Sequence, residues 1–178
     1  MSSSTNTPER TVEDLLIVFL DVTSFNRNST HRTDEEIAGL LDELYALISE
    51  RTMAAGGRVV KYIGDGALLV WDPAIADQAV RALLSLLDDA HELFRRTGWD
   101  STLKIMAHAG PVVSGTFGTP ESHQYDIIGK AVNIVATLET RTVSLSQAAF
   151  RTLGPETRQL LKKHTPPVVY IPAGDPRP

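Results

Sequence analysis

The segment RVVKYIGDGALLVWD, residues 58–72, decides the fold of this chain. Two runs rich in valine, leucine and aromatic residues flank Gly64-Asp65-Gly66, a composition typical of a tight turn between paired strands. The segment therefore predicts a β-hairpin with Asp65 at its tip.

Upstream of the hairpin, LLIVFLD at 15–21 is a continuous apolar run that ends in an acid. Its length and composition predict a central strand covered on both faces. Thr33 and Glu36 then form a capping-box pattern, which predicts a helix that ends at Gly56-Gly57. Apolar residues recur along this helix at helical spacing: Ile37, Leu40, Leu41, Leu44, Leu47 and Ile48.

Downstream, Asp72-Pro73 predicts the start of a second long helix that ends at Gly98. The remaining pattern predicts a second strand pair over 102–110 and 111–118, a polar connection over 119–126 and a helix over 128–139. A short strand at 143–146, small helices at 148–153 and 156–163, and a last strand at 167–171 follow.

Mixed strands and long helices in this order predict an α+β fold, a ferredoxin-like sandwich with a mostly antiparallel sheet and helices packed on it. We expect one domain over residues 13–172, with flexible tails at 1–12 and 173–178.

The composition excludes several classes of protein. The chain has 178 residues, of which 42% are hydrophobic, and a net charge of −5, which argues against a broad nucleic-acid surface. The absence of cysteine excludes disulfides, thiolate zinc sites and cysteine nucleophiles. No apolar run approaches the length of about 18 residues that a membrane span requires. MSSSTNTPER also lacks a signal-peptide pattern, so we expect a cytoplasmic protein with no membrane partner.

Asp21 and Asp65 are the candidate metal ligands. If their strands are neighbours, the two carboxylates meet at one end of the sheet and could hold Mg²⁺ or Mn²⁺, which prefer oxygen ligands. The alternative is that Asp21 only caps a turn and Asp65 only suits the hairpin. After Asp21, the backbone of Val22 to Phe25 is expected to turn into a helix start that points N–H groups at an anion.

Lys61 and Asp126 form a second candidate constellation. An ammonium group can donate to a ring nitrogen of adenine while a carboxylate accepts from its exocyclic amine. The alternative is an ion pair on the strand surface. Asn133 lies mid-helix, where asparagine is a poor helix former, so it has either a functional role or simple solvent exposure.

Four segments in order resemble the signature segments of class III nucleotide cyclase catalytic domains: VFLDVTSF, GGRVVKYIGDGALLVW, IMAHAGPVVSGTFG and QYDIIGKAVNIVATLE. The segment KKHTPPVVYI resembles the last strand of that domain, so the resemblance covers residues 14–171.

This resemblance implies an adenylate cyclase that converts ATP to 3′,5′-cyclic AMP and pyrophosphate with two divalent ions, Mg²⁺ or Mn²⁺. It also implies a homodimer with two shared sites, in which one subunit supplies the metal ligands and the other reads the base. The implied roles are metal binding for Asp21 and Asp65; phosphate binding for Val22, Thr23, Ser24, Phe25 and Lys162; adenine selection for Lys61 and Asp126; and ribose orientation for Asn133.

Thr137 departs from the family pattern, because the family has its transition-state arginine there. Loss of one such donor typically costs about 10²–10³ in rate, so we expect a slowed enzyme. Arg141, one helical turn further on, is a candidate replacement. Two alternatives stay open: a nucleotide-binding or dimerisation module without useful turnover, and a cyclase for another nucleotide.

Overall fold

The ferredoxin-like arrangement predicted from the sequence forms the centre of the computed structural model, which describes residues 10–175. Its strands lie in the order β2-β3-β1-β4, and each neighbouring pair is antiparallel. The elements are β1 (Arg10–Val22), α2 (Asp34–Ala54), β2 (Arg58–Ile63), β3 (Gly66–Trp71), α3 (Ala76–Thr97) and β4 (Leu103–Phe117). Short helices α1 (Phe25–Ser29) and η1 (Pro73–Ile75) precede α2 and α3.

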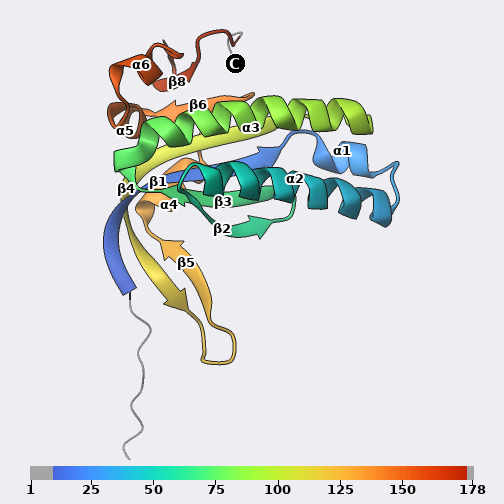
Figure 1. The fold of residues 1–178 in the computed structure, drawn as a ribbon, viewed down its shortest axis with the longest axis horizontal. Helices are drawn as coiled ribbons and strands as arrows, with labels where there is room; N and C mark the ends of the chain where they lie inside the picture. Colours follow the sequence, from blue (N-terminus) through green and yellow to red (C-terminus); the bar gives the residue numbers. More distant parts are fainter. Residues whose placement is uncertain (1–9, 176–178) are drawn as a thin grey trace, which may run out of the picture.

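Further strands extend this sheet beyond β4. The added elements are β5 (Gln124–Ile128), α4 (Lys130–Ala136), β6 (Val143–Ser146), α5 (Gln147–Arg151), α6 (Pro155–Arg158), β7 (Leu161–His164) and β8 (Val169–Pro172). β6 lies parallel to β4, and β8 and β7 continue the sheet to its far edge. β5 pairs with the second half of β4, and the two project from the body as a ribbon (Figure 1).

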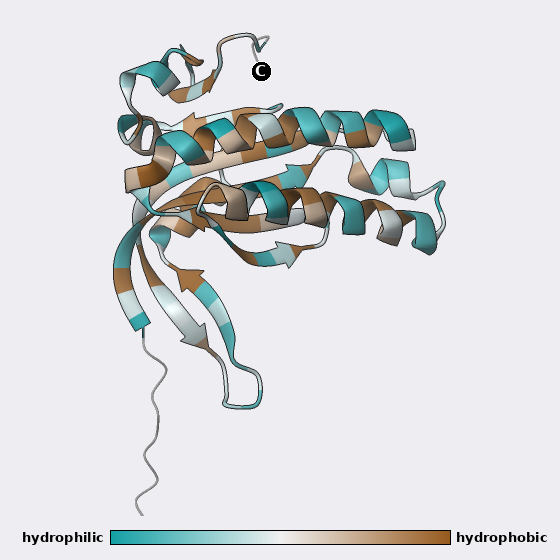
Figure 2. Cartoon of the chain, in the orientation of Figure 1, coloured by the Kyte–Doolittle hydropathy of each residue, from teal (hydrophilic) through white to brown (hydrophobic). Residues whose placement is uncertain are grey.

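α2 and α3 cover one face of the sheet (Figure 1). Alternate residues of β1, including Leu16, Val18 and Leu20, are buried beneath these helices. The strands are mostly hydrophobic, whereas hydrophilic residues recur along α2 and α3 (Figure 2). The predicted capping box at Thr33 and Glu36 and the predicted helix end at Gly98 are both present.

The opposite face of the sheet is only partly covered. Leu15 and Ile17 of β1 pack there with Ala131 and Val135 of α4. β1 is therefore buried on both sides along most of its apolar run, as predicted. Because α4 has only seven residues, the part of this face near Asp21 is not covered by a helix, and we call it the open face.

The predicted strand pair at 102–118 is wrong, because β4 is one strand. Gly110-Pro111 suggested a turn, but β1 pairs continuously across it, from Arg10 opposite Gly115 to Val22 opposite Leu103. The partner strand is β5, which occupies part of the predicted polar connection.

Several predicted boundaries also differ from the structure. The helix predicted over 128–139 is α4 and ends at Ala136, and the helix predicted over 156–163 is limited to Pro155–Arg158 because Leu161–His164 pairs with β8. β1 includes residues 10–12, and the Ala173 N–H donates to the Leu160 carbonyl, so both predicted tails are shorter. Residues 1–9 and 176–178 of those tails lie outside the described residues. Within residues 10–175, no helix has the length and hydrophobicity needed to cross a bilayer.

Candidate active site

The tip of the β2–β3 hairpin lies against the end of β1, which places Asp65 beside Asp21. Leu20 is paired with Ala67, directly before Asp21. A Cβ atom on Gly66 would come within 2.4 Å of the Leu20 carbonyl oxygen, so only glycine permits this close approach. The two carboxylates therefore meet at one end of the sheet, as the sequence predicted if the strands were neighbours.

The electrostatic environment of Asp21 is dominated by burial and by Asp65. Partial burial raises the pKa of Asp21 above its ordinary value, and the negative charge of Asp65 raises it further. Lys104 opposes both effects, with its Nζ 3.8 Å from Asp21 Oδ2. A cation between the carboxylates would relieve their repulsion, so this pair fits a divalent metal ion.

The protein supplies few metal ligands beyond this pair. Within residues 10–175 there is no group of three or more histidine, aspartate or glutamate side chains placed to hold an ion. Mg²⁺ commonly binds through one or two carboxylates and completes its shell with water and substrate phosphates. The donor set suits an ion that arrives with a phosphorylated substrate.

Lys104 is a candidate site residue that sequence reasoning missed. Its neighbours Leu103 and Ile105 are buried beneath α2 and α3, so Lys104 points to the open face. The signal available in the sequence was a single charged residue within the apolar alternation of 103–107.

A hollow of about 540 Å³ lies on the open face beside Asp21. Its sheet side consists of Phe19, Asp21, Lys104 and Met106. The end of α4 and the segment that follows it close the other side, with Ala136, Leu138, Glu139 and Thr140. Hollows of this volume accommodate small-molecule ligands.

The segment 22–25 turns into a short helix, as predicted. The Thr23 N–H donates to the Thr102 carbonyl at 2.9 Å, and Thr23 Oγ1 accepts from the Thr102 N–H at 2.8 Å. Ser24 has a left-handed backbone (φ 57°) and precedes α1. Among the described residues, the N–H groups of Phe25 and Asn26 have no hydrogen-bond partner.

Lys61 lies on the face of the sheet that α4 partly covers, because β2 contains a β-bulge. Val59 pairs with Leu69 and Lys61 with Leu68, so Val60 is an extra residue. Leu69 belongs to the core beneath α2 and α3, whereas Leu68 belongs to the core beneath α4. In a regular strand Lys61 would share the face of Val59, so the bulge redirects its side chain.

Lys61 and Asp126 form an ion pair in the structure. Lys61 Nζ donates to Asp126 Oδ2 at 2.6 Å, and Asp126 Oδ1 accepts from the Ile127 N–H at 2.8 Å. Gly115, opposite Asp126 on β4, has no side chain to compete for the carboxylate. This geometry is compatible with both interpretations drawn from the sequence, an ion pair on the strand surface and a pair that reads a base.

The remaining predicted residues lie on other elements of the fold. Asn133 is exposed on α4, and Thr137 ends that helix, with its hydroxyl donating to the Ile134 carbonyl at 2.9 Å. Lys162 is on β7, separated from β1 by β4, β6 and β8, and its Nζ donates to the Asp175 carbonyl. Arg141 is exposed in the loop before β6.

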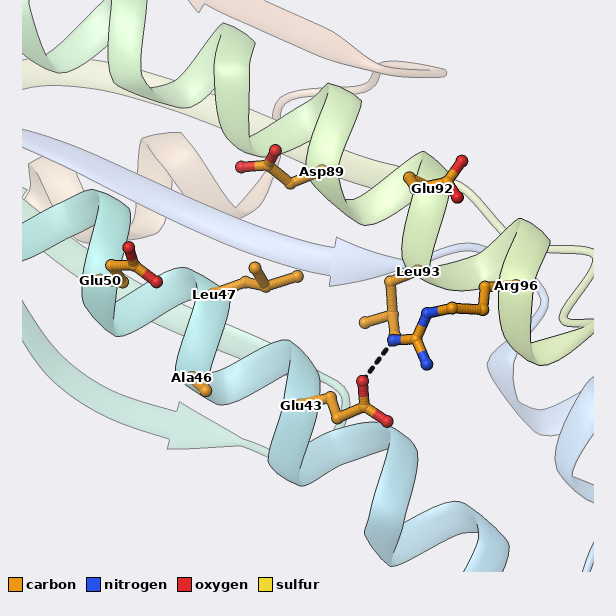
Figure 3. A pocket seen from close by; sticks show the side chains of 8 residues that line it. All are labelled: Glu43, Ala46, Leu47, Glu50, Asp89, Glu92, Leu93 and Arg96. Carbon is orange, nitrogen blue, oxygen red and sulfur yellow. Dashed lines mark hydrogen bonds and ion pairs between the residues drawn. The ribbon is translucent and has the colours of Figure 1, made fainter.

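A second hollow, of about 410 Å³, lies between α2 and α3 on the other side of the molecule (Figure 3). Glu43, Glu50, Asp89 and Glu92 make its lining acidic, and Arg96 pairs with Glu43 across it. None of the predicted site residues lines this hollow.

Comparison with protein families gives one match over most of the chain. The model of the adenylate and guanylate cyclase catalytic domain matches residues 7–168.

Two curated relatives come from Rhizobium meliloti (strain 1021). Adenylate cyclase 1 is 28% identical over 137 residues, which are 71% of this chain and 20% of that protein. Adenylate cyclase 2 is 26% identical over 170 residues, which are 92% of this chain and 45% of that protein. The chain thus spans less than half the length of these relatives.

Among solved structures, the guanylyl cyclase Cya2 superposes with a TM-score of 0.80 at 20% identity. The superposition covers 96% of each chain. At this identity the likeness establishes the fold alone. A preference for adenine or guanine has to be argued from the residues of this chain.

Proposed function

Since the chain belongs to the adenylate and guanylate cyclase catalytic domain family, we propose that it is an adenylate cyclase, which converts ATP to 3′,5′-cyclic AMP and pyrophosphate. The observation that carries the choice of adenine is the contact of 2.6 Å between Lys61 Nζ and Asp126 Oδ2.

The Lys61–Asp126 pair offers a donor and an acceptor side by side. Adenine presents a ring nitrogen that accepts and an amine that donates, so the ammonium and the carboxylate can each find a partner. Guanine presents an N–H and a carbonyl oxygen at the same two positions. The pair would then set donor against donor and acceptor against acceptor, which favours ATP over GTP.

Asp21 and Asp65 would hold divalent cations, Mg²⁺ or Mn²⁺. When bound, such ions lower the pKa of the ribose 3′-hydroxyl and neutralise charge on the phosphates. Lys104, 3.8 Å from Asp21, and the unpaired N–H groups at the start of α1 add positive potential for the triphosphate. We assign ribose orientation to Asn133 and place Lys162 at the terminal phosphates.

In the proposed reaction, the ribose 3′-hydroxyl gives its proton to solvent water, and the 3′-oxygen attacks the α-phosphorus. The bond from that phosphorus to the bridging oxygen of the β-phosphate breaks, and pyrophosphate leaves with the electron pair. No oxidant or reductant is needed.

We propose that two chains share each site, with Asp21 and Asp65 of one protomer facing Lys61 and Asp126 of its partner. In support, the hollow beside Asp21 is lined by neither Lys61 nor Asp126. Large apolar side chains are also exposed on the two strands that carry the ion pair and on α4, namely Ile63 on β2 (45% exposed), Ile128 on β5 (53%) and Ile134 on α4 (44%). A partner covering them would remove this apolar surface from water.

Thr137 favours a second candidate, a domain that binds nucleotide with little turnover. Its hydroxyl is bonded to its own helix, and threonine has no cationic fork for a phosphoryl group. A cyclase for another nucleotide is the third candidate.

One assay separates these functions. The purified chain is incubated with Mn²⁺ and, in turn, ATP, GTP, CTP and UTP, and the products are identified by mass spectrometry, with Asp65→Ala as the control. We expect cyclic AMP from ATP with the wild-type chain only. Cyclic GMP as the main product overturns the assignment of adenine. Tight ATP binding with no cyclic product supports the binding domain.

A further inference from the structure

β5, which carries Asp126, is not paired by backbone hydrogen bonds with β2, which carries Lys61. β5 pairs with β4, and β2 pairs with β3. A hollow of about 460 Å³ opens beside the start of β2, with Arg58 and Tyr125 among its lining residues. β4 holds β5 in the sheet, and side chains supply the direct contacts between β5 and β2.

Two side-chain contacts bridge β2 and β5. The first is the Lys61–Asp126 ion pair, at 2.6 Å. The second is the guanidinium of Arg58, whose Cζ lies 4.2 Å from the centre of the Tyr125 ring. Such a distance is well within the range of a cation–π interaction.

These two contacts respond differently to a nucleotide. When Lys61 and Asp126 turn to a base, their hydrogen bonds are redirected and their mutual contact weakens. Arg58 lies three residues before Lys61 on β2, and Tyr125 lies directly before Asp126 on β5, and neither belongs to the proposed base-reading pair. Their contact remains to hold β5 against β2.

We infer that Arg58 and Tyr125 are positioning residues, which keep Asp126 at the correct distance from Lys61 for recognition of adenine. The inference rests on the proposed function of Lys61 and Asp126. Tyr125 also packs on the core beneath α4, which fixes its ring while Arg58 remains exposed.

The test compares four variants in the full chain: Tyr125→Leu and Arg58→Met, which remove the contact, and Tyr125→Phe and Arg58→Lys, which keep a ring or a cation. A matched control is Phe117→Leu, because Arg10 Cζ lies 4.6 Å from the Phe117 ring on the same ribbon but links it to β1. Thermal melting verifies that every variant is folded.

We expect Tyr125→Leu and Arg58→Met to raise KM for ATP about two- to fivefold, the loss expected of an exposed cation–π contact, with kcat unchanged. Tyr125→Phe, Arg58→Lys and Phe117→Leu should keep the wild-type KM. In a Lys61→Met background, Tyr125→Leu should cause no further loss of ATP affinity, measured by direct binding and not by turnover, because the residue it positions against is gone.

An unchanged KM in Tyr125→Leu, with Lys61→Met impaired, overturns this inference and leaves the proposed function intact. If Lys61→Met is itself neutral, the proposed base-reading role fails. In that case, amide hydrogen exchange tests whether the Arg58–Tyr125 contact holds β5 against β2, independently of nucleotide binding. Faster exchange over residues 124–128 in Tyr125→Leu than in Phe117→Leu supports it, and equal exchange overturns it.

Discussion

Substitution of Thr137 by arginine should accelerate the proposed reaction. We propose that Thr137 occupies the position of the family's transition-state arginine, and it is exposed at the end of α4. Restoration of one preorganised donor is worth up to about 10²–10³ in rate, or roughly 2.7–4 kcal/mol. Because the helix ends before this position, we expect a gain at or below the lower limit of that range, an increase in kcat of about 10-fold to 10²-fold.

The fold should tolerate this change. Arginine removes the hydrogen bond from the Thr137 hydroxyl to the Ile134 carbonyl, which costs about 0.5–1.5 kcal/mol. It also places a cation at the C-terminal end of a helix that has no basic residue in its last turn, which contributes about 0.3–1 kcal/mol. The two effects nearly offset each other, so the free energy of unfolding should change by less than about 1 kcal/mol.

The assay measures cyclic AMP formation from Mn²⁺-ATP at saturating and limiting ATP. The gain should appear in kcat, since the contact forms mainly in the transition state. Thr137→Lys supplies a cation without the fork and should gain less. A folded Thr137→Arg with the wild-type kcat would refute the reasoning and turn attention to Arg141.

Three further predictions concern the metal, the base and pH. Asp21→Ala or Asp65→Ala should abolish turnover at any Mn²⁺ concentration, and the stabilisation of the wild-type chain by Mn²⁺ (about 2.7 kcal/mol at 100 times Kd), measured by thermal melting, should disappear. Lys61→Glu with Asp126→Cys should move the ratio of kcat/KM for ATP and GTP toward GTP, and an unchanged ratio would return both residues to a surface ion pair. Burial lowers the pKa of His108, whose Nδ1 lies 2.8 Å from Ser146 Oγ, so the unfolded chain binds the proton more readily. Stability should therefore fall as pH drops below about 6.5 toward the lower folded-state pKa, and His108→Gln should flatten this part of a urea-denaturation pH series.

Local sequence signals predicted the elements whose boundaries depend on near neighbours. The capping box at Thr33, the turn at Gly64-Asp65 and the apolar run at 15–20 each determine structure within a few residues. The meeting of Asp21 and Asp65 followed from these elements, because it requires only that β1 and β3 are neighbours.

Features that depend on distant pairing could not be predicted in the same way. Pro111 stays within β4 because β1 pairs on both sides of it, which overrides the local turn signal. The bulge at Val60 redirects Lys61, and no local pattern in residues 58–63 indicates it. The early end of α4 likewise changes the setting of Thr137, which terminates the helix instead of lying inside it.

The most direct test of the account mixes two defective variants, Asp65→Ala and Lys61→Met, in equal amounts and measures cyclic AMP formation from Mn²⁺-ATP. Each variant alone should be nearly inactive, since one lacks a metal ligand and the other lacks a base-reading donor. After exchange of protomers, half of the dimers should be mixed and each should contain one intact site, which predicts about one quarter of the wild-type activity. A mixture as inactive as its folded components, or full activity in either variant alone, would contradict a cyclase site assembled from these residues of two chains.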